Sequence, residues 1–194
     1  MRIPPSYPMA LLAALITLTP ICILMVLASD SSSYFDSHNL AILGNTLALM
    51  GLTVLGSILI GVPLAFISAY VHLPFKKAWL VLFAAPLAIP SYIGAFTLYA
   101  AFGPGGEINN LLGFETPPMY GLSGAAIVMT LYTFPFVMMT TRSSLLSLDA
   151  SMVNAARTLG MSMTQSVFNV ILPRVVNGIA AGSLLVALYT LSDF

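Results

Sequence analysis

Long apolar segments separated by short polar links dominate the pattern of this chain. Cutting the 194-residue sequence at its charged residues leaves four uncharged stretches that can each hold the roughly 20 apolar residues needed to cross a bilayer. The pattern predicts an all-α membrane protein, a polytopic bundle of transmembrane helices. The predicted helices cover residues 9–28, 40–71, 78–102 and 122–141, and a fifth starts near residue 175 and runs to the end.

The composition agrees with a membrane protein. Hydrophobic residues make up 59% of the chain and charged residues only 6%, against about 25% charged in ordinary soluble domains. The first apolar segment is longer than the roughly 7 to 15 residues of a signal-peptide core, so we interpret it as a membrane helix. The single cysteine, Cys22, allows no intrachain disulfide and is interpreted as a small apolar filler.

The placement of charges predicts the orientation. All six basic residues fall at the N-terminus or in alternate links, which the positive-inside rule assigns to the cytoplasm. Four of the acidic residues fall in the other links: Asp30, Asp36, Glu107 and Glu115. We therefore expect a cytoplasmic N-terminus, outer links over residues 29–39 and 103–121, and a cytoplasmic segment over residues 142–174.

Small residues and prolines mark expected helix contacts and bends. Ser57, Gly61, Ala65 and Ala69 recur every four residues, a stripe that lets a neighbouring helix approach closely. Gly178 and Gly182 are interpreted in the same way. Prolines inside apolar segments are expected to bend or loosen their helices. These are Pro63, Pro86, Pro90 and Pro135.

The last apolar segment is short. A helix over residues 179–194 would rise about 24 Å at 1.5 Å per residue, less than the roughly 30 Å hydrocarbon core of a bilayer. We therefore expect the sequence to be a piece of a longer protein, truncated within the fifth helix.

The cytoplasmic segment carries two helix signals that meet at a glycine. Apolar residues recur at helical spacing over residues 148–159, with Asp149 at the expected N-cap and Gly160 at the expected C-terminal turn. Ser162 and Gln165 have the spacing of a capping box, which predicts a second short helix. We expect Pro173 to stop that helix and to open the fifth membrane helix.

This bent pair has two interpretations. A short helix held across the mouth of a bundle can sit in a groove of another protein and transmit movement as a lever. Alternatively, it is an amphipathic helix that rests at the membrane surface.

The spacing in this segment resembles the coupling loop of bacterial ABC importer permeases of the type I fold. That pattern reads Glu-Ala-Ala, three residues, Gly, nine residues, an aliphatic, one residue, and Leu-Pro. The matching residues are Asn154, Ala155, Ala156, Arg157, Gly160, Val170, Leu172 and Pro173. Asn154 stands where the family has Glu, so this chain has no carboxylate at that position.

The resemblance covers most of the chain. It implies an N-terminal membrane helix and outer link over residues 1–38 and an incomplete permease domain over residues 39–194, with the coupling loop at 142–174. Three segments are similar to the ferric iron permeases in particular, with thiamine and polyamine relatives sharing some of the pattern. They are residues 85–92 (APLAIPSY), residues 102–106 (FGPGG) and residues 191–194 (LSDF).

The resemblance also implies partners. It implies a bacterial inner-membrane, multi-pass permease served by an external periplasmic binding protein and by cytoplasmic ATPase subunits that hold ATP and Mg²⁺. The missing half would be a C-terminal part or a second copy of the permease. The chain itself has no phosphate-binding loop, so we expect no bound cofactor and no ATPase activity in it. Its surroundings are the lipid bilayer, and no nucleic acid is expected.

Few polar residues lie within the apolar segments. Asp193 would lie deep in the fifth helix, where an acid is costly, and we weigh a pathway or gating role equally against a hydrogen bond between helices. Ferric coordination would need several oxygen ligands to converge. The tyrosines that could supply them, such as Tyr92, Tyr99 and Tyr132, are more often interface anchors, so we predict no metal site and no catalytic residue.

Two other classes of protein were weighed against a transporter. An intramembrane protease would need facing catalytic or metal-binding side chains, but neither histidine lies inside a span and no G-x-S-x-G or H-E-x-x-H motif occurs. A plain membrane anchor would not explain the spacing from Asn154 to Pro173. The prediction is therefore a permease subunit, with ferric iron as the expected cargo and thiamine, a polyamine or an oxyanion as alternatives.

Overall fold

The computed structural model describes residues 18–19, 22–23, 25–26, 37–72, 74–103, 105–112, 120–158 and 160–193. They belong to two compact units, Met1–Leu43 and Gly44–Phe194. The predicted helix over residues 9–28 lies largely outside the described residues, and the parts of it that are described are helical. Among the described residues, three helices are long and apolar enough to cross a membrane, or four if one bent pair counts as a span. The predicted all-helical membrane fold is confirmed.

The first long helix is α2 (Ser37–Tyr70), and it confirms the predicted helix over residues 40–71. Its buried positions recur every three or four residues and include Ser57, Gly61 and Ala65 from the predicted stripe. A Cβ atom added at Gly61 would lie 2.9 Å from the backbone oxygen of Phe134. The small residues therefore do bring two helix backbones close together, as is usual in membrane bundles.

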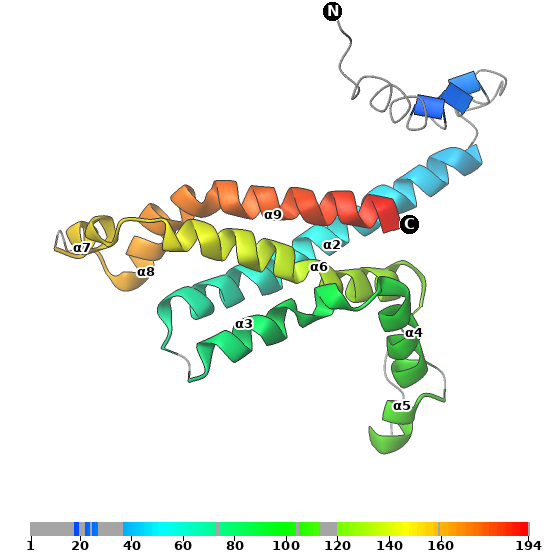
Figure 1. Cartoon of the computed structure of the whole chain (residues 1–194), viewed down its shortest axis with the longest axis horizontal. Helices are drawn as coiled ribbons and strands as arrows, with labels where there is room; N and C mark the ends of the chain where they lie inside the picture. Colours follow the sequence, from blue (N-terminus) through cyan, green and yellow to red (C-terminus); the bar gives the residue numbers. More distant parts are fainter. Residues whose placement is uncertain are drawn as a thin grey trace, which may run out of the picture. The chain divides into compact units, whose positions relative to one another are not determined.

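The predicted single helix over residues 78–102 is wrong. The chain instead forms α3 (Lys76–Ala84), a 3-10 turn η1 (Ala85–Ala88) and α4 (Ser91–Phe102), with a bend of 95° between the two halves. Ile89, which precedes Pro90, has an extended backbone with φ −99° and ψ 127°, as expected for a residue before proline. The prolines were correctly interpreted as bends, but Figure 1 shows that α4 turns away from α3 and does not continue it.

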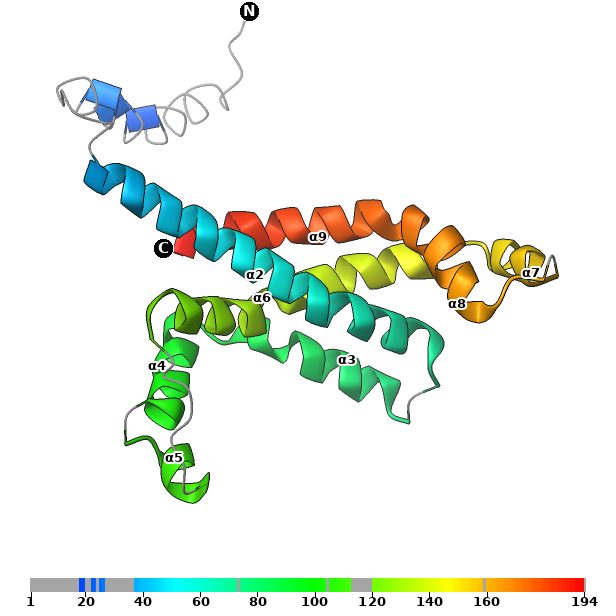
Figure 2. The same cartoon turned by 180° about the vertical axis from the view of Figure 1, so that it is seen from behind.

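The central pair of helices is α6 (Gly121–Leu146) and α9 (Leu172–Asp193), which lie side by side in both views (Figures 1 and 2). α6 contains the predicted helix over residues 122–141 and runs five residues beyond it. The predicted close approach at two glycines of α9 is confirmed. An added Cβ would lie 2.9 Å from the backbone oxygen of Thr140 at Gly178, and 2.6 Å from the Cα of Val137 at Gly182.

Four short elements complete the fold. The helix α5 (Glu107–Leu112) follows α4, and α7 (Ala150–Thr158) follows α6. The helix α8 (Met163–Ser166) and the π-helical turn η2 (Val167–Ile171) then lead directly into α9. The connection between α6 and α9 is therefore a structured corner and contains two helices, as the sequence predicted.

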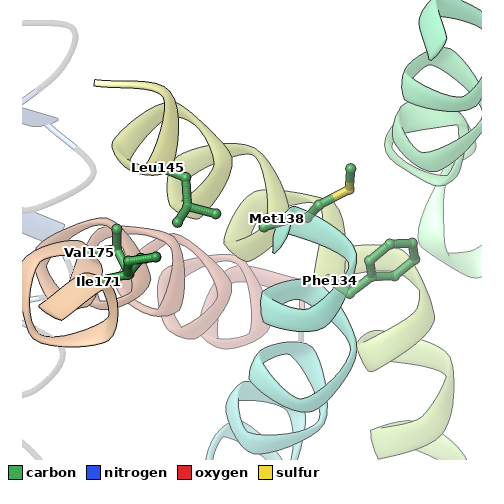
Figure 3. Packing of buried hydrophobic residues seen from close by; sticks show 6 residues of the cluster. Phe134, Met138, Leu145, Ile171 and Val175 are labelled. Carbon is green, nitrogen blue, oxygen red and sulfur yellow. The ribbon is translucent and has the colours of Figure 1, made fainter. Parts of the chain in front are cut away.

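The apolar core lies where α2, α6, η2 and the start of α9 meet (Figure 3). Leu145 of α6 points toward Ile171 and Val175, whereas Phe134 and Met138 lie beside the ribbon of α2. Ile171 and Val175 are completely buried. This core packs the end of α6 against the start of α9. The corner that joins these two helices therefore emerges from a well-packed part of the structure.

A buried hydrogen bond ties α2 to α6. The hydroxyl of Thr133 donates to the backbone oxygen of Met129 at 2.7 Å, and the hydroxyl oxygens of Ser57 and Thr133 lie 3.0 Å apart. Because Thr133 has one hydroxyl proton, Ser57 is the donor in the second bond. Such bonds between membrane helices contribute about 0.6 to 1.7 kcal/mol each.

Candidate functional site

The corner between α6 and α9 begins with a capped helix. The carboxylate of Asp149 accepts a hydrogen bond from the backbone N–H of Ser151 at 2.9 Å, which confirms the predicted N-cap of α7. The backbone bond from Ser151, followed by the bond to its side chain, holds the pKa of Asp149 below its ordinary value. Asp149 lies outside the membrane-spanning helices, so its carboxylate is charged at neutral pH and favours the positive end of the helix dipole.

Gly160 turns the chain out of α7. Its φ is +89°, a left-handed conformation that glycine adopts without steric cost. The N–H of Gly160 donates to the oxygen of Arg157 at 3.0 Å, and the N–H of Met161 donates to the oxygen of Ala156 at 3.1 Å. These two bonds form a Schellman motif, so the predicted glycine cap is confirmed.

The next helix begins with the predicted capping box. The N–H of Gln165 donates to the hydroxyl of Ser162 at 3.2 Å, and the N–H of Ser162 donates to the side-chain oxygen of Gln165 at 2.9 Å. The expectation that Pro173 stops this helix is wrong. One continuous helical segment runs from Met163 to Asp193.

The reason for this continuity is the π-helical turn that precedes the proline. The N–H of Leu172 donates to the oxygen of Val167, five residues back. The wider turn leaves room for the ring of Pro173, which has no N–H to donate to the helix. Such turns occur often at functional sites. The corner is therefore joined rigidly to α9 and only turned sharply at Gly160.

The signature residues divide between the inside and the outside of the corner. Ala156 is buried, Val170 and Leu172 are half-buried, and Ala155 and Arg157 are exposed. The side chain of Asn154 lies outside the described residues. Four large apolar side chains of the corner are exposed, which the sequence did not predict: Met152, Met161, Met163 and Phe168. Because methionine adapts to irregular partner surfaces, these residues suit the corner to contact with another protein.

The corner and the basic link between α2 and α3 lie at the same end of the second unit (Figures 1 and 2). Lys76 and Lys77 follow that link as the first residues of α3, and the corner carries Arg157. The basic residues of these two links therefore face one side, as the predicted topology requires. Which side of the membrane this is remains the prediction of the positive-inside rule.

A cavity of about 580 Å³ lies at the opposite end of the α6–α9 pair. α4, the start of α6 and the last residue of α9 contribute to it. Its polar side chains belong to Ser91, Tyr92, Tyr99, Tyr120 and Asp193. Asp193 is the only charged residue among the described lining residues, and the structure thus brings the predicted pathway residue together with tyrosines from two other segments.

Tyr120 was not predicted as a cavity residue. It precedes the first turn of α6, and nothing in its local sequence indicates that it lines the same cavity as Asp193. Tyr132, which was considered together with Tyr92 and Tyr99, does not line the cavity. Its hydroxyl instead lies where a Cβ at Gly94 would be, so Tyr132 packs against the backbone of α4.

Conventional metal ligands do not gather in the described part of the chain. No group of three or more His, Cys, Asp or Glu side chains there could hold one ion. The oxygen donors of the cavity are mainly phenols, a type of ligand that such a group does not include.

The corner and the cavity both fall within a family match. Residues 61–194 match the binding-protein-dependent transport system inner membrane component. The chain belongs to this family. The predicted membership among ABC importer permeases is confirmed at this level, and the family is a transport component and not a class of enzymes.

Curated relatives of the permease carry different cargo names. The chain is 31% identical over 169 residues to the spermidine/putrescine permease protein PotB of Haemophilus influenzae, covering 84% of this chain and 59% of PotB. It is 28% identical to the molybdenum permease protein ModB of Azotobacter vinelandii, covering 82% and 71%. It is also 28% identical to the Fe(3+) permease protein FbpB 2 of Haemophilus influenzae, covering 79% and 28%.

A solved structure agrees with the fold. The permease resembles a chain of an amino acid ABC transporter crystallised with histidines, with a TM-score of 0.51 and 18% identity over 76% of this chain and 66% of that one. The similarity shows the shared fold alone. Because the relatives differ in cargo and the chain spans 59% of PotB, the family does not select a cargo.

Proposed function

We propose that this chain is the membrane-spanning part of an ATP-driven importer, and that its α7–α8 corner receives movement from a separate ATPase. The observation that carries this proposal is the Schellman turn at Gly160, which connects a capped helix to the continuous segment that becomes α9. A displacement of the corner is transmitted along α9, since packed helices shift between discrete arrangements.

The proposal includes the partners of the full-length protein. Cytoplasmic ATPase subunits would bind ATP and Mg²⁺ and contact the corner through its exposed methionines and Arg157. An external binding protein would deliver the cargo at the other side, and a second permease half or a second copy would complete the pathway. The protein would be a multi-pass protein of the bacterial inner membrane with its N-terminus in the cytoplasm.

Ferric iron is the cargo that we propose. The segments at residues 85–92, 102–106 and 191–194 resemble ferric iron permeases, and one curated relative is the Fe(3+) permease protein FbpB 2. PotB and ModB make a polyamine and an oxyanion the alternatives. The ligand that co-purifies with the cognate binding protein distinguishes the three, and an organic amine or an oxyanion there would exclude iron.

The coupling role is tested at Gly160. A Cβ added there would meet no atom within 4 Å, so a substitution acts through the backbone alone. Gly160→Val forces a β-branched residue into the left-handed region at a cost of about 1–2 kcal/mol. We expect it to abolish ATP-driven uptake by the full-length transporter and to uncouple the ATPase from the binding protein.

Gly160→Asn is the matched control, because asparagine tolerates the left-handed conformation. We expect it to retain most of the uptake at an equal level of membrane expression. Equal uptake by the Val and Asn variants would contradict the coupling role, and so would a full-length permease that never co-purifies with an ATPase.

A further inference from the structure

The cavity at the end of the α6–α9 pair gathers oxygen donors that are far apart in the sequence. Tyr92 and Tyr99 come from α4, Tyr120 from the residue before α6, and Asp193 from the end of α9. Residues that carry oxygen donors, and that the sequence alone did not bring together, thus line one cavity in the fold. We infer that this cavity is a transient binding site for the ferric ion, with the Asp193 carboxylate and the tyrosine phenols as its ligands. This inference rests on the proposed iron importer.

The positions of these tyrosines indicate that their side chains are not used to pack helices together. Tyr92, Ala95 and Tyr99 line the cavity at spacings of three and four residues, which places them on one face of α4. Tyr92 is 72% exposed and Tyr120 60% exposed, so their phenols are free to meet a ligand. Tyr132 has no such freedom, since its hydroxyl contacts the backbone of α4 at Gly94.

The chemistry of the lining fits a hard trivalent cation. Among the described residues, no Lys, Arg or His side chain lines the cavity, and the one charged side chain that does, Asp193, is negative. Carboxylate oxygen is a ligand for hard cations, whereas the described part of the lining contains none of the softer thiolate and imidazole ligands. Tyrosine oxygen is itself an established ligand of protein-bound iron. An oxyanion would be repelled by the Asp193 carboxylate and would meet no positively charged side chain among the described lining residues.

Binding would proceed without a change of oxidation state. When a tyrosine binds, its O–H bond breaks, the proton passes to water, and the phenolate oxygen forms a bond to Fe³⁺. No electron is transferred, so the ion stays ferric. Because each ligating phenol must lose its proton, affinity should fall as the pH is lowered.

The test uses the full-length permease in lipid nanodiscs, titrated with ferric nitrilotriacetate. Ferric phenolate complexes absorb visible light by charge transfer, and free iron and carboxylate complexes do not give this band. We expect the wild-type protein to develop the band and a Tyr92→Phe, Tyr99→Phe and Tyr120→Phe triple variant to lack it. Loss of an outer partner of a metal ligand already costs about 10–100-fold in affinity or activity, so the triple variant should lose at least about tenfold in iron affinity.

Two further variants complete the design. Tyr132→Phe removes a phenol that lies outside the cavity, and we expect it to keep the band and the affinity. Asp193→Asn keeps the phenols and removes the charge, so we expect a weaker affinity with the band still present. A band that persists in the triple variant would overturn the site, because the iron would then sit on other tyrosines.

The outcomes separate this site from the proposed function. If the wild-type transporter imports iron but shows no phenolate band, the cavity site is wrong and the importer stands. If the wild-type transporter imports no iron, the cargo proposal itself is wrong, whatever the spectrum shows. Iron uptake by the triple variant at the wild-type rate would also overturn the site, with ferric delivery by the binding protein unaffected.

Discussion

The corner and the cavity stand at opposite ends of the α6–α9 pair and are built in different ways. The corner runs from Ser147 to Ile171, and its hydrogen bonds join near neighbours, such as Ser162 with Gln165 and Gly160 with Arg157. The cavity draws on three segments that are separated by tens of residues. The first is a local structure, and the second exists only when the helices pack.

Because of this difference, the corner and the cavity respond differently when the helices move. A locally capped corner keeps its shape while it moves as a unit, which suits a part that transmits force. A cavity assembled from α4, α6 and α9 changes shape when any of these helices shifts, which suits a part that binds and releases a cargo. Some substitutions should therefore damage both regions, whereas others should damage the cavity alone or the corner alone.

The largest loss of stability should come from disrupting the close contact between α6 and α9, which supports both the corner and the cavity. In Gly182→Leu the new side chain would meet the backbone of α6 at Val137, 2.6 Å from the added Cβ. Overpacking of this kind costs about 1–3 kcal/mol or more, because neither backbone has room to move. We expect a large drop in thermal stability in detergent and a poor yield of monodisperse protein, with Gly182→Ala showing a smaller drop.

Gly51→Leu on α2 is the matched control for this prediction. A Cβ at Gly51 meets no atom within 4 Å, so the same change of residue adds helix propensity without a clash. Similar melting temperatures for the two leucine variants would show that the close approach of α6 and α9 does not support the fold.

A smaller effect, confined to the cavity, is expected at Gly94. The hydroxyl of Tyr132 occupies the space that a Cβ of Gly94 would need. Gly94→Ala should therefore push α4 away from α6, move Tyr92 and Tyr99, and weaken ferric binding while the melting temperature changes little. We expect Gly94→Ala with Tyr132→Ala to recover binding, because the smaller side chain clears the space.

Protease sensitivity of the corner provides the internal check for the Gly94 variants. Since α7 and α8 are at the other end of the pair, their cleavage pattern should stay that of the wild type. A changed pattern, or no recovery in the double variant, would mean that the two regions are not independent.

The same contrast explains how much the sequence could predict. Asp149, Gly160 and the Ser162–Gln165 pair act on backbone groups within a few residues, so their roles could be predicted from spacing alone, and the structure confirms each of them. The long helices were also predictable, because a bilayer requires about 20 apolar residues in each.

The predictions that were wrong concern interactions that cannot be inferred from the spacing of residues along the sequence. Pro173 was expected to end a helix, but a π-helical turn before it keeps the helix continuous. Pro86 and Pro90 were expected to bend one helix, but they separate α3 from α4 by 95°. Tyr120 and Asp193 line the same cavity although more than seventy residues separate them in the sequence, and the sequence indicated the tyrosines only as interface anchors.

The smallest effect is expected at the cap of α7. Hydrogen bonds from Ser151 lower the pKa of Asp149 in the folded protein, so its contribution to stability is fully present above the pKa of an unfolded aspartate, about 3.9. That contribution is lost as the pH falls through the lowered value.

We expect amide exchange in α7 to accelerate below about pH 4 in the wild type. In Asp149→Asn the side-chain oxygen still accepts from Ser151 without titrating, so this acceleration should be absent. Because the cap is local, exchange in α6 and ferric binding at neutral pH should be the same in both proteins. An equal acceleration in the Asn variant would show that another group controls the corner at low pH.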